Sequence, residues 1–227
     1  MNLLAIETAT ECCSVALLSG ERLIARSEIA PRRHAELLLP MCEDVLAEAG
    51  LARRDVDVIA VGRGPGAFTG VRLAISAAQG IAFALDIPVV PVSSLAALAM
   101  QAPDNGCDVL SIIDARMGEV YSALFRYSNG RVEQVTDETV GSAESLRLPA
   151  ETALDVIGTG WTSYQASIRK LLPSPPRWAE GERYPQAADV ARLAMPIAAA
   201  GGGIAAELVL PVYLRDKVAL TLAEQRR

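Results

Sequence analysis

Val61-Gly62-Arg63-Gly64-Pro65-Gly66-Ala67-Phe68-Thr69-Gly70-Val71-Arg72 is the segment around which the chain is organised. The apolar run before it, residues 56–61, predicts a buried strand, and the apolar pattern over residues 71–85 predicts a long helix. A strand, a glycine-rich turn and a helix N-terminus together make a place where backbone N–H groups can approach an anion or another chain closely.

This glycine-rich loop supplies the first candidate site residues, which are Gly62, Gly64, Gly66, Thr69 and Gly70. No Gly-Lys-Ser/Thr follows, so the spacing is not that of a phosphate-binding P-loop, and it also differs from Gly-x-Gly-x-x-Gly. The loop by itself therefore does not identify a ligand, although an anion at the helix N-terminus stays open as a secondary reading.

Composition sets limits on the class of protein. The 227 residues are 51% hydrophobic, which is enough for one large or two small domains with a sizeable core. No apolar run reaches the roughly 18 residues of a membrane span, and residues 1–4 do not look like the start of a signal peptide. We therefore expect a cytoplasmic protein without a membrane contact. The net charge of −6 argues against strong direct binding to tRNA or DNA.

Cysteine and histidine usage predicts neither a metal site nor another cofactor. The spacing of Cys12, Cys13, Cys42 and Cys107 fits neither a zinc site nor a Cys-x-x-Cys pair, so we expect reduced, mostly buried thiols. His34 is the only histidine, and Leu38 occupies the position four residues later where a second ligand would lie on the same helix face.

The order of predicted elements indicates a duplicated α/β fold. The first part of the chain predicts three strands (2–8, 15–19 and 23–28) and a helix (33–49). Two strand–helix pairs follow, with strands at 56–61 and 88–92 and helices at 71–85 and 93–101. After the break at Pro103-Asp104-Asn105-Gly106 a looser copy follows, with strands at 109–114, 120–127, 132–140 and 153–157 and helices near 143–148, 164–172 and 187–200. This order predicts two lobes, residues 1–104 and 105–227, each with a mixed five-stranded sheet and flanking helices. It resembles the actin-like, ribonuclease H-like superfold of ATPases and sugar kinases.

The two hairpins that hold phosphate in that superfold look degraded here. The first candidate, Glu7-Thr8-Ala9-Thr10, carries a Cβ at Ala9 where glycine would allow close approach of the backbone. The second, Asp114-Ala115-Arg116-Met117-Gly118-Glu119, has bulky side chains in place of glycines. We expect the fold to be kept and the nucleotide pocket lost, with a vestigial ATPase as an alternative.

Two helices have more apolar surface than one sheet needs. The helix over residues 71–85 is apolar nearly all round, and one side is built from small residues that would let another helix come close. The helix over residues 33–49 also shows a broad apolar arc. The predicted interface with a second protein consists of Leu37, Met41, Leu73, Ala77, Gly80 and Ala84. The alternative is that helices of the same chain cover this surface.

Five segments closely resemble the bacterial TsaB family, also called YeaZ. They are residues 6–10, 63–72, 114–121, 158–161 and 211–215, and the likeness runs from Leu3 to Val218. The motif residues carried by these segments are Glu7, Asp114, Arg116, Tyr121, Tyr213 and Arg215. One departure is Ala67, where the family frequently has Ser.

The resemblance implies a non-catalytic scaffold in the synthesis of threonylcarbamoyladenosine on tRNA. It implies binding to TsaD, the metal-bearing transferase and paralogue, through helices of the N-terminal half, with the small ATPase TsaE joining the pair. It also implies homodimers of isolated members through the same surface, and contact with tRNA only through the complex. The metal motif of TsaD, His-x-x-x-His, corresponds here to His34 and Leu38. Older naming of such proteins as glycoproteases leaves a metallopeptidase as a further alternative.

Overall fold

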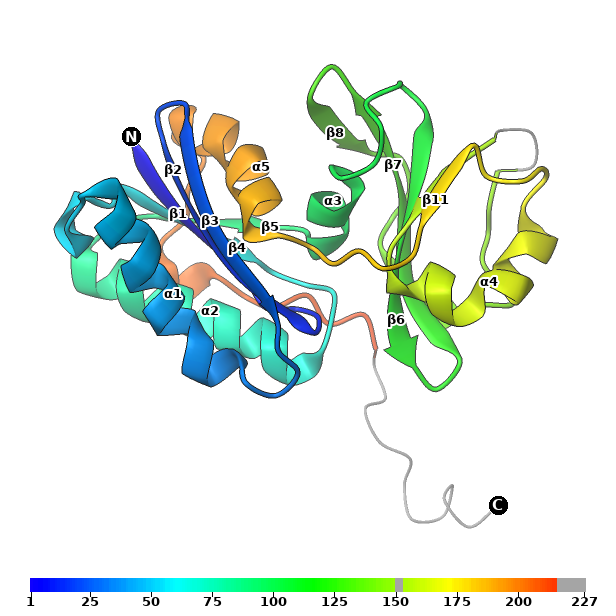
Figure 1. Ribbon diagram of the computed structural model, residues 1–227, viewed down its shortest axis with the longest axis horizontal. Coiled ribbons are helices and arrows are strands. Elements are labelled where there is room, and N and C mark those ends of the chain that lie inside the picture. Colours follow the sequence, from blue (N-terminus) through cyan, green and yellow to red (C-terminus); the bar gives the residue numbers. More distant parts are fainter. Residues whose placement is uncertain (150–152, 216–227) are drawn as a thin grey trace, which may run out of the picture.

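The computed structural model describes residues 1–149 and 153–215, which form two α/β halves side by side (Figure 1). The first half contains a five-stranded sheet in the order β3-β2-β1-β4-β5. Its strands are β1 (Asn2–Glu7), β2 (Cys12–Ser19), β3 (Arg22–Ile29), β4 (Val58–Gly62) and β5 (Val89–Val92). Strands β1, β4 and β5 run parallel, and β2 is antiparallel to both β1 and β3. The carboxyl ends of β1, β4 and β5 therefore meet at one edge, where the glycine-rich loop begins.

The second half repeats this order with one strand more. Its sheet runs β11-β10-β6-β7-β8, with β9 also paired to β7. Its strands are β6 (Asp108–Arg116), β7 (Glu119–Ser128), β8 (Arg131–Gln134), β9 (Thr139–Ser142), β10 (Asp155–Ile157) and β11 (Trp178–Glu180). The fold class is confirmed, but the prediction of a five-stranded second sheet is wrong, because the described residues form six strands.

The extra strand arises where the sequence suggested one continuous strand over residues 132–140. Gln134 pairs with Phe125 and Thr139 pairs with Ser122, so four residues on one side face only two on the other. The surplus breaks the strand into β8 and β9, and Thr136 Oγ1 accepts the free N–H of Leu124 at 2.9 Å. The strand β11 was not predicted, because its three residues carry no clear alternating pattern.

Helices cover the faces of both sheets (Figure 1). On the first sheet, α1 (His34–Ala49) and α2 (Phe68–Leu85) lie on one face and α5 (Ala187–Ala199) lies on the other. On the second sheet, α3 (Ser94–Ala99) and α4 (Thr159–Leu171) lie on opposite faces. Two short 3-10 helices, η1 (Arg53–Asp55) and η2 (Ala206–Leu208), complete the described elements.

The ends of the helices follow local chemistry. Ser93 caps α3 by accepting the N–H of Ala96 at 3.1 Å, and Gly50 ends α1 in the left-handed conformation that glycine favours. Pro40 lies inside α1, so the helix does not begin there. The helix predicted near residues 143–148 is a turn followed by irregular chain. The polar tail from Asp216 lies outside the described residues.

Helix α5 belongs by packing to the first half, although it follows the second sheet in the chain. Its buried residues Ala187, Val190 and Ala191 pack against Leu3 and Ala5 of β1. The boundary between residues 104 and 105 stays a prediction, but the range 105–227 includes this part of the core of the first half.

Candidate functional site

The glycine-rich loop packs its backbone onto the turn between β1 and β2. The N–H of Ala67 donates to the carbonyl of Ala9 at 2.7 Å, and the hydroxyl of Thr8 donates to the carbonyl of Gly70 at 2.7 Å. A Cβ at Gly66 would lie 2.3 Å from Ala9 O, and one at Gly70 would lie 2.1 Å from Thr8 O. The glycines at 66 and 70 are therefore required by this contact between two backbones. Gly64, with a φ of +88°, turns the chain, and Thr69 lies exposed in the first turn of α2.

Glu7 lies beneath this loop, fully buried at the end of β1. Its Oε1 accepts the N–H of Ala9 at 2.6 Å, and its Oε2 accepts the hydroxyl of Ser94 at 2.6 Å. A Cβ at Gly62 would lie only 2.0 Å from Oε2. Burial raises the pKa of Glu7 above 4.5, and the hydrogen bonds from Ser94 and Ala9 oppose this shift without cancelling it. Glu7 thus ties together β1, the β1–β2 turn and the start of α3.

A cleft of 250 Å³ lies between the two halves. Four segments line it: the β1–β2 turn, the start of α2, the hairpin between β6 and β7, and residues 212–215. Five of the six predicted motif residues meet here, namely Asp114, Arg116, Tyr121, Tyr213 and Arg215, whereas Glu7 lies outside the lining. The structure thus brings together motifs that are more than a hundred residues apart in the sequence.

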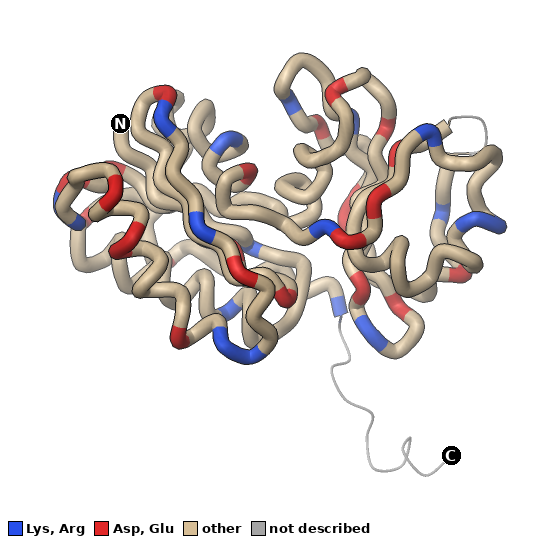
Figure 2. The backbone as a smooth tube through the Cα atoms, in the orientation of Figure 1, with Lys and Arg blue, Asp and Glu red and all other residues tan. Residues whose placement is uncertain are grey.

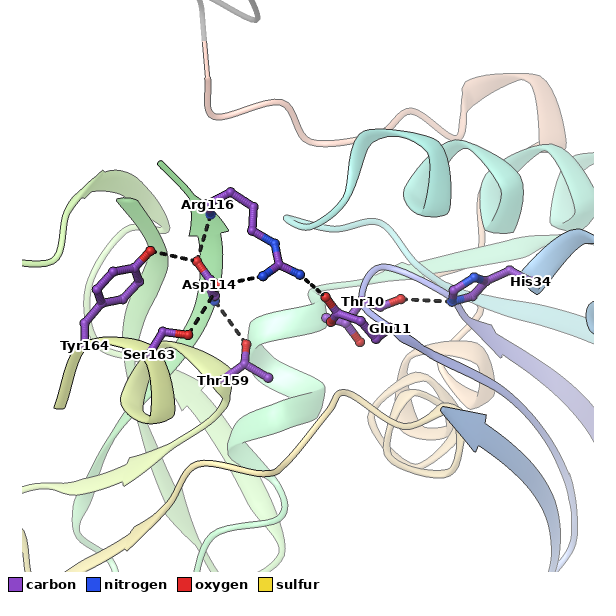
Figure 3. Close-up of polar contacts among 8 residues, drawn as sticks. All are labelled: Thr10, Glu11, His34, Asp114, Arg116, Thr159, Ser163 and Tyr164. Carbon is purple, nitrogen blue, oxygen red and sulfur yellow. Dashed lines mark hydrogen bonds and ion pairs between the residues drawn. The ribbon is translucent and has the colours of Figure 1, made fainter. Parts of the chain in front are cut away.

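The charged groups of this cleft are paired with one another (Figure 3). The Asp114 carboxylate accepts three hydrogen bonds: from the backbone N–H of Arg116 at 2.8 Å, from the Arg116 guanidinium at 3.0 Å and from the Tyr164 hydroxyl at 3.1 Å. The same guanidinium reaches across the cleft and donates to Glu11 of the first half. Burial, followed by the hydrogen bond to Asp114, raises the pKa of Tyr164. The pairing leaves Arg116 between two carboxylates.

Tyr213 and Arg215, near the end of the described residues, also line the cleft. Arg215 donates to the carbonyl of Ala115 at 3.1 Å and also pairs with Glu119. The guanidinium of Arg72 lies 3.7 Å from the centre of the Phe68 ring and 5.3 Å from that of Tyr213, and it donates to the Tyr213 hydroxyl. Phe68 and Arg72 were not predicted as site residues, although they stand one helical turn apart in the quoted segment.

His34 shows how a candidate metal ligand is used here (Figure 3). Its Nε2 lies 2.9 Å from the carbonyl oxygen of Thr10, so this nitrogen carries a proton and donates it. Leu38 is 1% exposed and packs in the core beneath α1. Within residues 1–149 and 153–215, no group of three or more His, Cys, Asp or Glu side chains is placed to hold a metal ion.

The outer face of α1 and α2 is the second candidate site. An apolar groove of 530 Å³ runs between the two helices, lined by residues that include Leu39, Pro40, Leu46, Gly80, Ile81 and Ala84. Of the predicted interface residues, Gly80 and Ala84 are exposed, and Leu37, Leu73 and Ala77 are half-buried. Met41 is 9% exposed and packs in the core, so its inclusion in the exposed face is wrong. Met41 follows Leu38 by three residues, which brings both side chains to the inner side of α1.

Two large exposed side chains on these helices are not among the six predicted interface residues. Leu39 is 56% exposed and Phe83 is 82% exposed. Both occupy helix positions that do not face the core. The spacing of the core residues along each helix identifies such positions from the sequence. By length and composition alone α2 would also fit a membrane span, although one side of it covers the first sheet.

Along the part of the chain that the structure describes, charged residues of both signs are spread over both halves (Figure 2). Figure 2 shows Lys and Arg interspersed with Asp and Glu along both halves. Several of the arginines pair with carboxylates nearby, as Arg26 does with Glu48 and Arg126 with Asp108.

Comparisons with known proteins agree on one family. The family model described as "TsaD: tRNA N6-adenosine threonylcarbamoyltransferase" matches residues 25–168. The tRNA threonylcarbamoyladenosine biosynthesis protein TsaB of Escherichia coli is 40% identical over 96% of each chain. That of Bacillus subtilis is 35% identical over 76% of this chain and 75% of the relative.

Solved structures from Pseudomonas aeruginosa match nearly the whole molecule. One described as YeaZ is 44% identical, covers 94% of this chain and 99% of its own, and has a TM-score of 0.86. A second, described as similar to peptidase YEAZ, is 45% identical with the same coverage and TM-score.

Proposed function

Because the chain belongs to the TsaB family of tRNA threonylcarbamoyladenosine biosynthesis proteins, we propose that it serves this tRNA modification as a non-catalytic subunit. In this proposal it binds a TsaD-like transferase through the outer face of α1 and α2, and a TsaE-like ATPase joins the pair. Contact with tRNA is made through the complex. A homodimer of the isolated chain uses the same face.

The observation that carries the proposal is the uncovered apolar face of α1 and α2. Helix α5 lies on the opposite side of the first sheet, and no described element covers the groove. An added Cβ at Gly80 would meet nothing within 4 Å, so the backbone of α2 is open to close approach there. Gly80 and Ala84 line the groove together with the exposed Leu39, and an apolar groove of this kind fits the apolar face of a helix.

The absence of intrinsic chemistry is supported by how the polar groups are used. The guanidinium of Arg116 stands between Glu11 and Asp114, and His34 is engaged with a backbone carbonyl. Leu38, at the position that corresponds to the second histidine of the TsaD motif, is packed in the core. Arg116 joins the two halves, and the polar side chains named here are already engaged with partners inside the protein.

Co-purification tests the proposed interface. Gly80→Lys places a long charged side chain on the groove without an internal clash. It should abolish co-purification with a TsaD-like partner without lowering the temperature of thermal unfolding, because lysine favours a helix more than glycine does. Gly141→Lys is the matched control, because a Cβ there also meets nothing within 4 Å but lies on β9 of the second half. Retention of the partner by the Gly80→Lys chain would refute the assignment of this face.

Activity tests the role in the reaction. A reconstituted threonylcarbamoyl transfer to tRNA should proceed with the wild-type chain and its partners, and should drop to the level without the chain when Gly80→Lys replaces it. Modification of tRNA by the isolated chain would refute the non-catalytic role.

A further inference from the structure

The hairpin between β6 and β7 adopts an unusual backbone. Arg116 and Met117 have φ values of 65° and 57°, followed by Gly118 at 79°. Met117 and Gly118 form the two-residue turn, for which positive φ is normal. Arg116 lies outside that turn, at a shift in strand register after Asp114. A non-glycine residue keeps such a conformation only when its surroundings hold it, so the contacts of Arg116 require an explanation.

The shift aims the side chain of Arg116 at the first half. Its guanidinium pairs with Glu11, the last residue of the β1–β2 turn, and with Asp114 of its own strand. Asp114 is in turn fixed by the hydroxyl of Tyr164, and its backbone N–H donates to Thr159 Oγ1 at 3.0 Å (Figure 3). The second half thus presents an oriented cation to an acid of the first.

Residues 209–215 connect the same hairpin to the first half from another side. Gln79 of α2 donates to the carbonyl of Val209 at 3.1 Å, and the N–H of Val212 donates to the carbonyl of Arg63 at 3.0 Å. Three residues later Arg215 reaches the hairpin at Ala115 O and Glu119. This segment is a strap that begins on the first half and ends on the second.

A third connection joins the glycine-rich loop to the segment between β8 and β9. Glu138, in the surplus residues between β8 and β9, is mostly buried and pairs with Arg63 of the glycine-rich loop at 3.1 Å. It also accepts the hydroxyl of Ser93, the residue that caps α3. The break that splits the third strand therefore supplies the carboxylate for this pair.

We infer that these three connections form an internal clasp, consisting of Arg116–Glu11, the strap with Arg215–Glu119, and Arg63–Glu138. The clasp holds the cleft at one opening without a ligand. Each connection joins atoms of different halves, and a hinge motion of the kind that closes two-lobed proteins around ligands would separate all of them. The two halves therefore move as one body, whether or not a partner occupies α1 and α2.

Spin-label distances in the full chain test the clasp. Labels at Ala47→Cys on α1 and Ala166→Cys on α4 report one distance between the halves, in a Cys107→Ser background that removes the partly exposed native thiol. The wild-type chain should give one narrow distance distribution that ATP and magnesium leave unchanged. Arg116→Ala combined with Arg215→Ala should broaden it about two-fold or more, because a hinge motion is released. Arg126→Ala is the control, since Arg126 pairs with Asp108 within the second half.

A second pair of variants keeps the test decisive if the double arginine variant does not fold, as judged by circular dichroism. Glu11→Gln with Glu119→Gln removes the charges that face the two arginines and should broaden the distribution in the same direction. A broad or two-state distribution in the wild-type chain, a shift on adding ATP and magnesium, or a width unchanged by the folded double variants would each overturn the clasp.

Discussion

Gly62→Ala should destabilise the protein strongly through one side chain, that of Glu7. The added Cβ would lie 2.0 Å from Oε2 and 2.6 Å from Cδ of a carboxyl group with no exposed surface. The φ of Gly62 is outside the left-handed region, so alanine is compatible with the backbone there. The substitution therefore tests a contact between side chains, free of the backbone strain that accompanies most glycine replacements.

The expected loss combines two terms. Overpacking a closed site costs about 1–3 kcal/mol. Displacing the carboxyl group also breaks its hydrogen bonds to Ala9 N and Ser94 Oγ and leaves buried donors unpaired, at about 1–3 kcal/mol each. The sum is about 3–9 kcal/mol, a large part of the roughly 5–15 kcal/mol by which a natural domain is stable.

Urea unfolding followed by the fluorescence of the buried Trp161 measures this loss, and a double-mutant cycle with Glu7→Ala assigns it. In the Glu7→Ala background the carboxyl group is absent, so adding Gly62→Ala should cost about 1 kcal/mol or less. An equal cost of Gly62→Ala in both backgrounds would refute the reasoning, because the clash would then lie elsewhere.

Three further predictions follow from the site. Burial raises the pKa of Glu7 above 4.5, so the unfolded chain loses this proton first as the pH rises, and stability falls from pH 4.5 up through the folded pKa. Glu7→Gln should remove this dependence of stability on pH in urea unfolding at a series of pH values. An unchanged dependence would contradict the assignment. Gly80→Lys should make any dimer of the isolated chain monomeric in sedimentation velocity, with Gly141→Lys as the control, whereas a persisting dimer would place that contact on another face. Calorimetry should give no heat of binding for ATP with magnesium, and elemental analysis of the purified chain should give no stoichiometric zinc or iron; micromolar affinity or a bound metal would favour an ATPase or a metallopeptidase.

Much of the fold could be predicted because the strands and helices have strong local signals. The apolar run before Gly62 and the helix pattern after it gave β4 and α2 to within a few residues. The third strand of the second half could not be predicted correctly, since its break depends on how many residues of β7 it must pair with. That count is a property of the sheet and leaves no mark in the composition of residues 132–140.

The site was predicted as separate motifs and not as one place. Asp114 and Arg116 stood out in one segment and Tyr213 and Arg215 in another, but nothing local says that they share a cleft. The sequence shows where the glycines of the loop lie, but it does not show which neighbouring atoms require them. In the sequence, Gly66 and Gly70 are equally compatible with a neighbouring phosphate. The structure shows that their neighbour is the backbone of the β1–β2 turn.

The return of α5 to the first sheet has a consequence for synthesis of the chain. During translation the strands β1 to β5 and the helices α1 and α2 leave the ribosome first, but the sheet face that α5 covers stays bare until residues 187–199 have emerged. The nascent first half therefore exposes Leu3, Ala5 and Val90 to water while the whole second half is being made. A fragment that ends at residue 104 retains the same bare face permanently, so aggregation is the expected fate of both the fragment and a stalled nascent chain.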